Sequence, residues 1–542
     1  MNLWYDIQGD EMKTVIKELK NVQYLKDKYH LSSLCAKVLA YMELTEEEID
    51  EIIKHDTDLN DLSFPLLDKI IQRFQKAKEQ KEKVLVCGDY DCDGICATSI
   101  LSNALEIYGI DCGYYIPNRF KEGYGLHVNT VELAHKKGYS LLVTVDNGVK
   151  ALDALTLAKE YNIDVILSDH HNYEEDELIC DLFLHPNILP KQFKGMCGAG
   201  LAYLMSYALI GYHEKHAVLA GIATIGDVVP LRRVNRALVK RSIDLLNAGK
   251  YFAIQSLAND RQSWDEKKIA YQIVPKLNSI GRLADRANAN NVVRFLCSDD
   301  ANIIQDMVVQ INQLNGERKE LSSLMEERAS ALIQKEDNFH VLYDESFHEG
   351  INGIVASRFV NKLQQPVMVL SQSEGILKGS IRSNSVDLTN FFDDLKDSLI
   401  SYGGHKEAAG IAFAKEQLSF IKNYCNDKLV DYDEDASLSV LPLDKKEVTM
   451  DEILSLDQLK PFGCGFELPP FMIHDDSLEI VKMSNGKHLK YVGSDISYVY
   501  FNSGERYAQD KNKQIFTFVG SLEINYFRNN RSINMLVDHI ID

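Results

Sequence analysis

The sequence predicts an α/β protein of several domains. A parallel sheet comes first, a smaller α/β domain follows a long helix, and a β-rich barrel ends the chain. Short apolar runs alternate with helical stretches between residues 84 and 167, which is typical of a parallel sheet with crossover helices. The segment from Asn302 to Gln334 repeats apolar residues at helical spacing and has no proline. From about residue 440, short apolar runs alternate with turns in the manner of strands.

The composition is that of a folded, acidic protein. The chain has 542 residues, of which 45% are hydrophobic and 26% charged, and its formal net charge is −21. This balance excludes disorder as the main state. Because there is no overall basic field, a nucleic acid has to bind through a local basic strip or through metal ions. No apolar stretch reaches the roughly 20 residues of a membrane span. The cysteines are scattered, which indicates reduced thiols and a cytoplasmic location.

The pattern divides the chain into segments of different character. Helical spacing dominates the first and third of them, and strand-like runs the others. The predicted segments are an N-terminal helical region (1–79), a parallel-sheet domain (80–270), connecting helices (271–336), a smaller α/β domain (337–436) and a C-terminal barrel (437–542). The long helix within the connecting segment spans about 50 Å at 1.5 Å per residue.

The parallel sheet rests on short apolar runs with helical stretches between them. These runs are Val84–Cys87, Tyr114–Ile116, Leu141–Val145 and Val165–Leu167. Acidic residues and histidines follow three of them directly. The residues at these positions are Asp89, Asp91 and Asp93; Asp146; and Asp169, His170 and His171. Ligands of parallel sheets bind beyond the carboxyl ends of the strands, so we expect these side chains to meet in one site.

The residue types indicate the chemistry of that site. Carboxylate oxygens with imidazole nitrogens suit Mn²⁺ or a similar divalent ion. Aspartates packed together cannot all stay ionised without a compensating cation. A carboxylate shared by two ions about 3.5–4 Å apart is a common solution for phosphoryl hydrolysis. Asp227, after the apolar run 221–226, is a candidate final ligand.

A simpler interpretation is that these residues are turn and cap residues. Asp-Gly and Asn-Gly are common in turns, and aspartate is a good helix N-cap. For Asp146 taken alone, the turn interpretation is the better one. Three clusters at successive strand ends favour the metal interpretation for the set. Cys92, between two of the acids, could be a soft ligand, but its position in the alternation favours packing.

The motifs resemble those of the DHH phosphoesterase superfamily. They are DYDCDG (89–94), DNG (146–148), DHH (169–171) and GD (226–227), followed by GGHKEAAG (403–410), which is similar to the motif of the associated DHHA1 domain. Further segments resemble the RecJ branch, the single-strand-specific 5′→3′ DNA exonucleases: PNR (117–119), EGYG (122–125), NSIGR (278–282), GSIRS (379–383) and PFGCG (461–465). The resemblance implies a DHH domain, a DHHA1 domain and a C-terminal OB-like barrel.

The resemblance also implies roles for single residues. Asp91, Asp93, Asp146, His170 and Asp227 match the metal-ligand positions, with Asp146 as the bridge between two Mn²⁺ or Mg²⁺ ions. Asp89 and Asp169 belong beside or directly behind these ligands. His171 contacts the scissile phosphate or assists the leaving oxygen.

The resemblance also implies a second group of residues, which hold nucleic acid or phosphate. It consists of Arg119, Arg282, Arg358, Ser380, Arg382, Gly403, Gly404 and His405. Arginine offers a bidentate fork to phosphate, and we expect residues 403–405 to lie in a glycine-rich loop whose amides hold an anion. The alternative for each arginine is a surface ion pair with one of the many acids.

The C-terminal barrel interleaves bases with aromatic residues, such as Arg531 with Tyr526. Such a barrel can hold a single strand by stacking and phosphate contacts. The alternative is that most of these aromatic residues fill the barrel core.

We therefore expect a metal-dependent exonuclease that degrades single-stranded DNA from its 5′ end in repair and recombination. A single-strand-binding protein and a helicase are the expected partners, and a monomer is expected because one chain holds the whole site. Two other hypotheses stay open. One is a DHH phosphodiesterase of short oligonucleotides or cyclic dinucleotides, and the other is an inactive relative acting as a replication scaffold.

Overall fold

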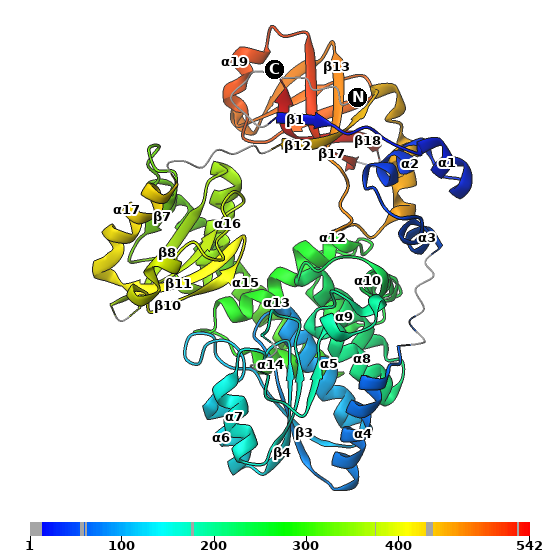
Figure 1. The fold of residues 1–542 in the computed structure, drawn as a ribbon. Helices are drawn as coiled ribbons and strands as arrows, with labels where there is room; N and C mark the ends of the chain where they lie inside the picture. Colours follow the sequence, from blue (N-terminus) through cyan, green and yellow to red (C-terminus); the bar gives the residue numbers. More distant parts are fainter. Residues whose placement is uncertain are drawn as a thin grey trace. The chain divides into compact units, whose positions relative to one another are not determined.

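The protein divides into two compact units in the computed structural model (Figure 1). The structure describes residues 13–54, 59, 62–174, 178–373, 375–429, 437–527 and 530–541. One unit comprises Asn60–Asp227 and Arg241–Glu434, and the other comprises Met1–Leu59, Val228–Lys240 and Asp435–Asp542. Among the described residues, no helix combines the length and the apolar character needed to cross a bilayer.

The first unit contains the predicted parallel sheet. Its strands are β2 (Lys83–Cys87), β3 (Asp111–Tyr115), β4 (Tyr139–Val145), β5 (Asp164–Ser168) and β6 (Leu182–Leu184), in the order β3-β2-β4-β5-β6. All neighbouring pairs are parallel. The four predicted strands are confirmed. Strand β6 was not predicted, because a run as short as Leu182–Leu184 has no period that distinguishes it from a loop.

Helices cover both faces of this sheet, as the nearly continuous apolar runs of its strands require. They are α4 (Pro65–Glu79), α5 (Cys92–Tyr108), α6 (Val128–Lys136), α7 (Leu152–Glu160) and α8 (Gly198–Ile210). Leu85, Leu142 and Leu167 pack against Val131 of α6 and Leu155 of α7. Helices α4, α5 and α8 lie on the opposite side (Figure 1). The carboxyl ends of the strands are thereby held at one edge.

A helical layer follows the sheet. Its helices are α9 (Glu214–Gly226), α10 (Arg233–Asn247), α11 (Phe252–Leu257), α12 (Glu266–Lys268), α13 (Val274–Arg282), α14 (Ala289–Cys297) and α15 (Ala301–Ser330). The predicted long helix is confirmed as α15, which has 30 residues. Its buried stripe includes Ile304, Ile311 and Met325.

The smaller α/β domain of this unit follows α15. Its elements are β7 (His340–Tyr343), α16 (Asn352–Leu363), β8 (Val367–Ser373), β9 (Ile376–Arg382), β10 (Ser401–His405), β11 (Ala408–Ala414) and α17 (Leu418–Lys428), with the sheet order β10-β11-β9-β8-β7. The expectation of a loop at residues 403–405 is wrong. These residues form edge strand β10, in which Gly403 pairs with Gly410 and His405 with Ala408. Glycine is uncommon in strands, so the local pattern did not indicate one.

The second unit combines both ends of the chain. Its helices are α1 (Val22–Tyr29), α2 (Ser33–Tyr41), α3 (Glu46–Lys54), α18 (Met450–Ser455) and α19 (Tyr507–Asp510), and its strands are β1 (Lys13–Ile16), β12 (Ser437–Leu443), β13 (Phe471–Asp476), β14 (Glu479–Met483), β15 (His488–Val492), β16 (Ile496–Tyr500), β17 (Ile515–Phe527) and β18 (Asn530–Ile541). The sheet order is β1-β12-β13-β17-β18-β16-β15-β14. Among the described residues no pairing joins β14 to β1, so the OB-like sheet is open where a barrel was expected.

The N-terminal segment shares a core with this sheet. Leu34 and Leu39 of α2 belong to the same buried cluster as Phe471 and Phe518. Strand β1 pairs in parallel with β12, whereas only helices were expected before residue 80. This pairing joins segments far apart in the sequence, so no local period could indicate it.

The PFGCG motif is explained by one buried arginine. Arg236 of α10 donates hydrogen bonds to the carbonyls of Pro461 (2.6 Å), Leu459 (2.8 Å) and Lys460 (2.9 Å). Its guanidinium lies 4.7 Å from the centre of the Phe466 ring. The segment 459–466, which contains the motif, therefore provides carbonyl acceptors and an aromatic face for a single cation.

Two helical glycines give a matched test of the packing. A Cβ on Gly281 of α13 would lie 2.6 Å from the carbonyl oxygen of Tyr90, whereas a Cβ on Gly316 of α15 would meet nothing within 4 Å. We expect Gly281→Ala to lower the free energy of unfolding by about 1–3 kcal/mol. Gly316→Ala should raise it by about 0.5–1 kcal/mol, since alanine favours the helix. Calorimetric unfolding midpoints measure both changes, and a stabilising Gly281→Ala would contradict the close approach.

Candidate metal centre and phosphate-binding residues

The strand ends bring the predicted acids and histidines together. Asp146 directly follows β4, and His170 lies just beyond the end of β5. His170 Nε2 lies 3.0 Å from Asp146 Oδ1, 3.6 Å from Asp227 Oδ2 and 3.8 Å from Asp93 Oδ2. Asp227 ends helix α9 and reaches this group from outside the sheet. The predicted convergence is therefore confirmed.

Side chains of this cluster can offer ligand atoms to cations in three overlapping sets. In each set the candidate ligand atoms lie within 4.8 Å of one another. The sets are Asp89, Asp91 and Asp146; Asp93, His170 and Asp227; and Asp146, His170 and His171. Asp146 belongs to two of them, which is the arrangement that a carboxylate bridging two ions requires.

Helix starts hold two of these carboxylates in place. Asp91 is the N-cap of α5, and its Oδ1 accepts the N–H of Gly94 at 2.9 Å. Asp93 accepts the N–H groups of Gly198 at 2.6 Å and Ala199 at 2.8 Å, at the start of α8. The positive ends of two helices thus face the acids. A Cβ on Gly198 would lie 2.4 Å from the Cβ of Asp146, so only glycine lets α8 approach this closely.

The acids of the cluster disfavour one another's ionisation. Burial, with the nearby charges of Asp93 and Asp91, holds the pKa of Asp146 well above its usual value. The same causes raise the pKa of Asp227 to about 9. A divalent cation removes this penalty, because it favours the charged form of each carboxylate.

Buried polar atoms without partners show that the residues fit a cation. Asp89 Oδ1, Asp146 Oδ1, Asp227 Oδ2 and His170 Nε2 are buried and have no hydrogen-bond partner. Such atoms are costly unless something binds them. A donor set of carboxylate oxygens with one imidazole suits Mn²⁺ and, through its oxygens, Mg²⁺.

Asp169 differs from its neighbours because its oxygens are fully engaged. Oδ2 accepts the N–H of Val149 at 3.0 Å, and Oδ1 lies 2.7 Å from His171 Nδ1. Burial opposes ionisation of Asp169, but these hydrogen bonds and the charge of His171 outweigh it and lower its pKa. Burial also works against the charged form of His171, but Asp169 outweighs it and raises the pKa of His171. Asp169 therefore orients His171 and lies behind the candidate metal ligands.

Arginines from different elements gather beside the acids, close enough for Arg119 to act on Asp89 and for Asp91 to act on Arg282. Burial lowers the pKa of Arg282 to about 10, and the positive charges of Arg119, Arg318 and Arg382 contribute to the shift. Arg318 of α15 is buried, donates to Asn315 Oδ1 at 2.6 Å and leaves its Nε without a partner. A group of mutually repelling guanidinium ions is a binding place for an anion.

The other predicted phosphate-binding residues lie in the smaller domain. A Cβ on Gly353 would lie 3.1 Å from Arg382 Nη2 and 3.4 Å from Ser380 Oγ, so these two groups lie close together. Arg358 is exposed and forms an ion pair with Glu326 at 2.6 Å, as in the alternative interpretation. Gly403, Gly404 and His405 are exposed on edge strand β10.

The cysteines at the site are buried in the interior. Cys92 is 1% exposed and Cys96 is fully buried. The hydrogen bond between the two thiols and burial raise the pKa of Cys92. The same hydrogen bond lowers the pKa of Cys96, but burial and nearby negative charges outweigh it and raise that pKa. Neither belongs to the sets of candidate metal ligands found among the described residues, which is consistent with the packing interpretation.

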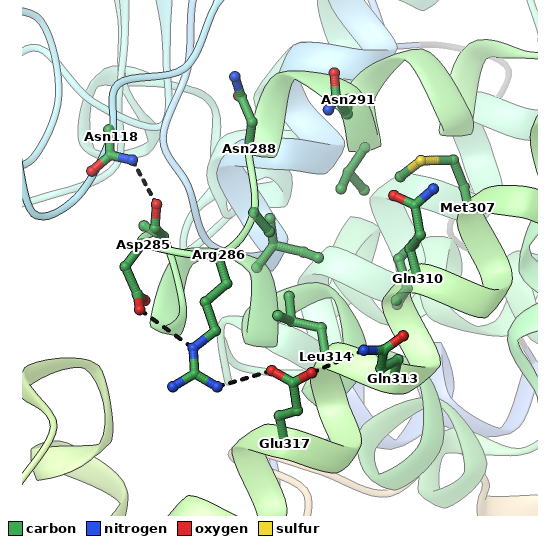
Figure 2. Close-up of a pocket in the computed structure, with 15 residues that line it drawn as sticks. Asn118, Asp285, Arg286, Asn288, Asn291, Met307, Gln310, Gln313, Leu314 and Glu317 are labelled. Atoms are coloured by element: carbon green, nitrogen blue, oxygen red, sulfur yellow. Dashed lines mark hydrogen bonds and ion pairs between the residues drawn. The ribbon is translucent and has the colours of Figure 1, made fainter.

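A pocket of about 520 Å³ lies among α13, α14 and α15 (Figure 2). Its floor is apolar and includes Leu314. On its polar wall, Arg286 pairs with Asp285 at 3.3 Å and with Glu317 at 2.9 Å (Figure 2). The guanidinium is therefore neutralised, and this pocket has a different chemistry from the arginine group.

Sequence reasoning gave no role to some residues that support the site. Asn278 Oδ1 accepts the N–H of Cys92 at 2.8 Å and so holds the loop that carries Asp91 and Asp93. The hydroxyl of Tyr124 donates to the carbonyl of Asp146 at 2.8 Å. Asn278 lies in the NSIGR motif and Tyr124 in the EGYG motif. These motifs were the signal in the sequence that could have indicated both residues.

Comparison with known families agrees with this geometry. Residues 83–226 match the N-terminal domain of the DHH family, residues 336–431 match the DHHA1 domain, and residues 441–539 match the RecJ OB domain. The matched ranges contain all of the candidate metal ligands except Asp227, which directly follows the first range.

Individual relatives extend the likeness over nearly the whole chain. A single-stranded-DNA-specific exonuclease RecJ of Bacillus subtilis is 28% identical, and the match covers 95% of this chain and 69% of that protein. The crystal structure of RecJ with Mn²⁺ from Thermus thermophilus has a TM-score of 0.85 at 25% identity, covering 97% of this chain and 78% of that one. A manganese-bound exonuclease RecJ is 31% identical, with a TM-score of 0.61 over 69% of this chain and 96% of that chain. With its converged acids, its DHHA1 sheet and its OB-like sheet, the chain belongs to the RecJ family of DHH phosphoesterases.

Proposed function

We propose that this protein is a metal-dependent exonuclease that degrades single-stranded DNA from the 5′ end. The observation that carries the proposal is the convergence of Asp91, Asp146, His170 and Asp227, with buried ligand atoms that have no partner. The relatives named above are single-stranded-DNA-specific exonucleases, and two of their structures contain manganese.

The candidate ligands are Asp91, Asp93, Asp146, His170 and Asp227, with Asp89 beside them. Two Mn²⁺ or Mg²⁺ ions bound there lower the pKa of water and neutralise phosphate charge. Asp146 belongs to two of the three candidate sets and would serve as the bridge. His171, oriented by Asp169, faces the reacting phosphate and assists departure of the leaving oxygen.

Recognition of the strand is assigned to positive and aromatic residues. Arg119, Arg282 and Arg382 provide a positive group for phosphate, with Ser380 beside Arg382. A pocket for a terminal 5′ phosphate sets the direction of degradation. In the OB-like sheet, Tyr491 and Tyr498 are fully buried and serve the core, while Tyr526 is 65% exposed beneath Arg531. Tyr526 is thus available for stacking on a base.

The two other hypotheses are less well supported. An inactive scaffold requires no intact ligand set, yet every predicted ligand converges here. A phosphodiesterase of short substrates has no use for the OB-like unit. His405, Gly403 and Gly404 stay predicted phosphate contacts, as does Arg358. Action in the cytoplasm, a monomeric state, and partnership with a single-strand-binding protein and a helicase also stay predictions.

The first test removes the proposed bridge. We expect Asp146→Asn to lower the rate of nucleotide release from single strands by more than about 100-fold, because changes even behind metal ligands cost about 10–100-fold. The measurement is release from 5′-phosphorylated strands with Mn²⁺. Asp153→Asn, an exposed acid in the first turn of α7, is the matched control and should behave like the parent. Equal activity of Asp146→Asn and the parent would overturn the proposal.

The second test uses the raised pKa of Asp227, which is about 9 against a usual value of 3.8. A raised acid pKa means that the metal-free protein loses stability as the pH rises from about 4 towards 9. Mn²⁺ displaces these protons, so its affinity increases over the same range. We expect Mn²⁺ to raise the unfolding midpoint more at about pH 8.5 than at about pH 6.5. Asp227→Asn should reduce this difference, and an equal shift at both pH values would contradict it.

The third test concerns the arginine group. Arg282→Ala and Arg382→Ala should each weaken binding of single strands and flatten the dependence of log K on log salt by about 0.7 for each lost phosphate contact. Both should also reduce the preference for a 5′-phosphorylated over a 5′-hydroxyl strand. Arg261→Ala, an exposed arginine, is the control. An identical salt slope in all three variants would argue against phosphate binding by this group.

A further inference from the structure

Tyr124 lies where the metal-ligand cluster meets His171. It belongs to the loop between β3 and α6, and 44% of the residue is exposed. Its ring meets the ring of His171 edge-on, with centroids 5.6 Å apart, and the ring of Tyr90 edge-on at 6.3 Å. The proposed function gives this side chain no role.

The hydroxyl of Tyr124 joins two functional residues. It donates its proton to the main-chain carbonyl of Asp146 at 2.8 Å. The same oxygen lies 3.2 Å from Nδ1 and 3.4 Å from Nε2 of His171. Because a phenol has one proton, the oxygen can only accept from the imidazole while it donates to Asp146. Since Nδ1 faces Asp169, the imidazole donor to Tyr124 is Nε2.

The imidazole of His171 is thereby held from two sides. Asp169 Oδ1 lies 2.7 Å from Nδ1, and the Tyr124 oxygen contacts the ring from another direction. Asp169 alone leaves the ring free to tilt about that single hydrogen bond.

We propose that Tyr124 is a positioning residue, whose hydroxyl fixes the imidazole of His171 relative to the carboxylate of Asp146. This rests on the proposed function, in which water forms a bond to phosphorus and the P–O3′ bond breaks. The leaving 3′ oxygen takes up a proton, giving a mononucleotide with a 3′ hydroxyl and a strand with a new 5′ phosphate. Tyr124 acts on this step through His171 and touches neither the phosphate nor a metal ion.

The test removes the hydroxyl and keeps the ring. We expect Tyr124→Phe to lower kcat by about 10-fold, as for other residues that orient a ligand or catalytic group. KM, the Mn²⁺ concentration for half-maximal activity and the unfolding midpoint should stay unchanged. Tyr161→Phe removes a hydroxyl from a tyrosine that stacks on His135 at the end of α7, and it should behave like the parent.

A double-mutant cycle separates positioning from general loosening of the site. In a His171→Ala background, Tyr124→Phe should cost nothing further, since the group that it positions is gone. An unchanged kcat in Tyr124→Phe would overturn the inference. So would a loss of the same size with and without His171, because the hydroxyl would then act independently of that residue.

A substrate in which sulfur replaces the 3′ oxygen of the 5′-terminal nucleotide tests whether protonation of the leaving group is the affected step. Sulfur leaves without a proton, so both His171→Ala and Tyr124→Phe should recover most of the parent rate. Recovery by His171→Ala alone would overturn the role of Tyr124 and leave the proposed function intact. A failure of the proposed function would be seen in a different experiment, because Asp146→Asn would then keep full activity.

Discussion

The structure depends on a cluster of buried carboxylates that cannot all be ionised in the absence of cations. Burial and like charge raise the pKa of Asp146 and Asp227, and buried oxygens of both residues have no partner. A fold gains nothing in stability from such a cluster by itself. The cluster is tolerated because the sheet, loops and helices hold the side chains in place. A bound cation neutralises the negative charge of the carboxylates.

The contacts that fix the ligands are also contacts that begin helices. Asp91 caps α5, and Asp93 receives the first N–H groups of α8. Loss of either helix start would therefore displace a candidate ligand, and loss of that carboxylate would leave helix N–H groups without acceptors.

The arginine group carries the opposite charge to this acidic cluster. Arg282 is destabilised in its charged form by its neighbours, as Asp146 is by its own. An anion would favour the charged arginines, and divalent cations favour the charged acids, so the fold gathers unfavourable charge of both signs.

Much of this site could be predicted from the sequence because its signal is local. Because polar residues follow the apolar runs, Asp89, Asp146 and His170 could be predicted to lie at one sheet edge. The motifs added Asp227. What could not be predicted depends on pairing between distant segments. Strand β1 exists only through β12, and the second sheet is open because of how its strands are ordered. The strand at Gly403–His405 resembled a loop because glycine obscures the strand pattern. Asn278 and Tyr124 were visible as motif residues, but their roles depend on a main-chain N–H and a carbonyl that no sequence pattern reveals.

Neighbouring strand ends carry two aspartates with opposite behaviour, and hydrogen bonding decides between them. Asp169 accepts hydrogen bonds with both oxygens, so its pKa is lowered and it needs no cation. Asp146 follows the adjacent strand, yet its Oδ1 has no hydrogen-bond partner and its pKa is raised. The same residue type is thus a support in one place and a candidate ligand in the other. A sequence shows both as an aspartate after an apolar run, and only the count of unsatisfied oxygens distinguishes the residue that orients His171 from the candidate metal ligand.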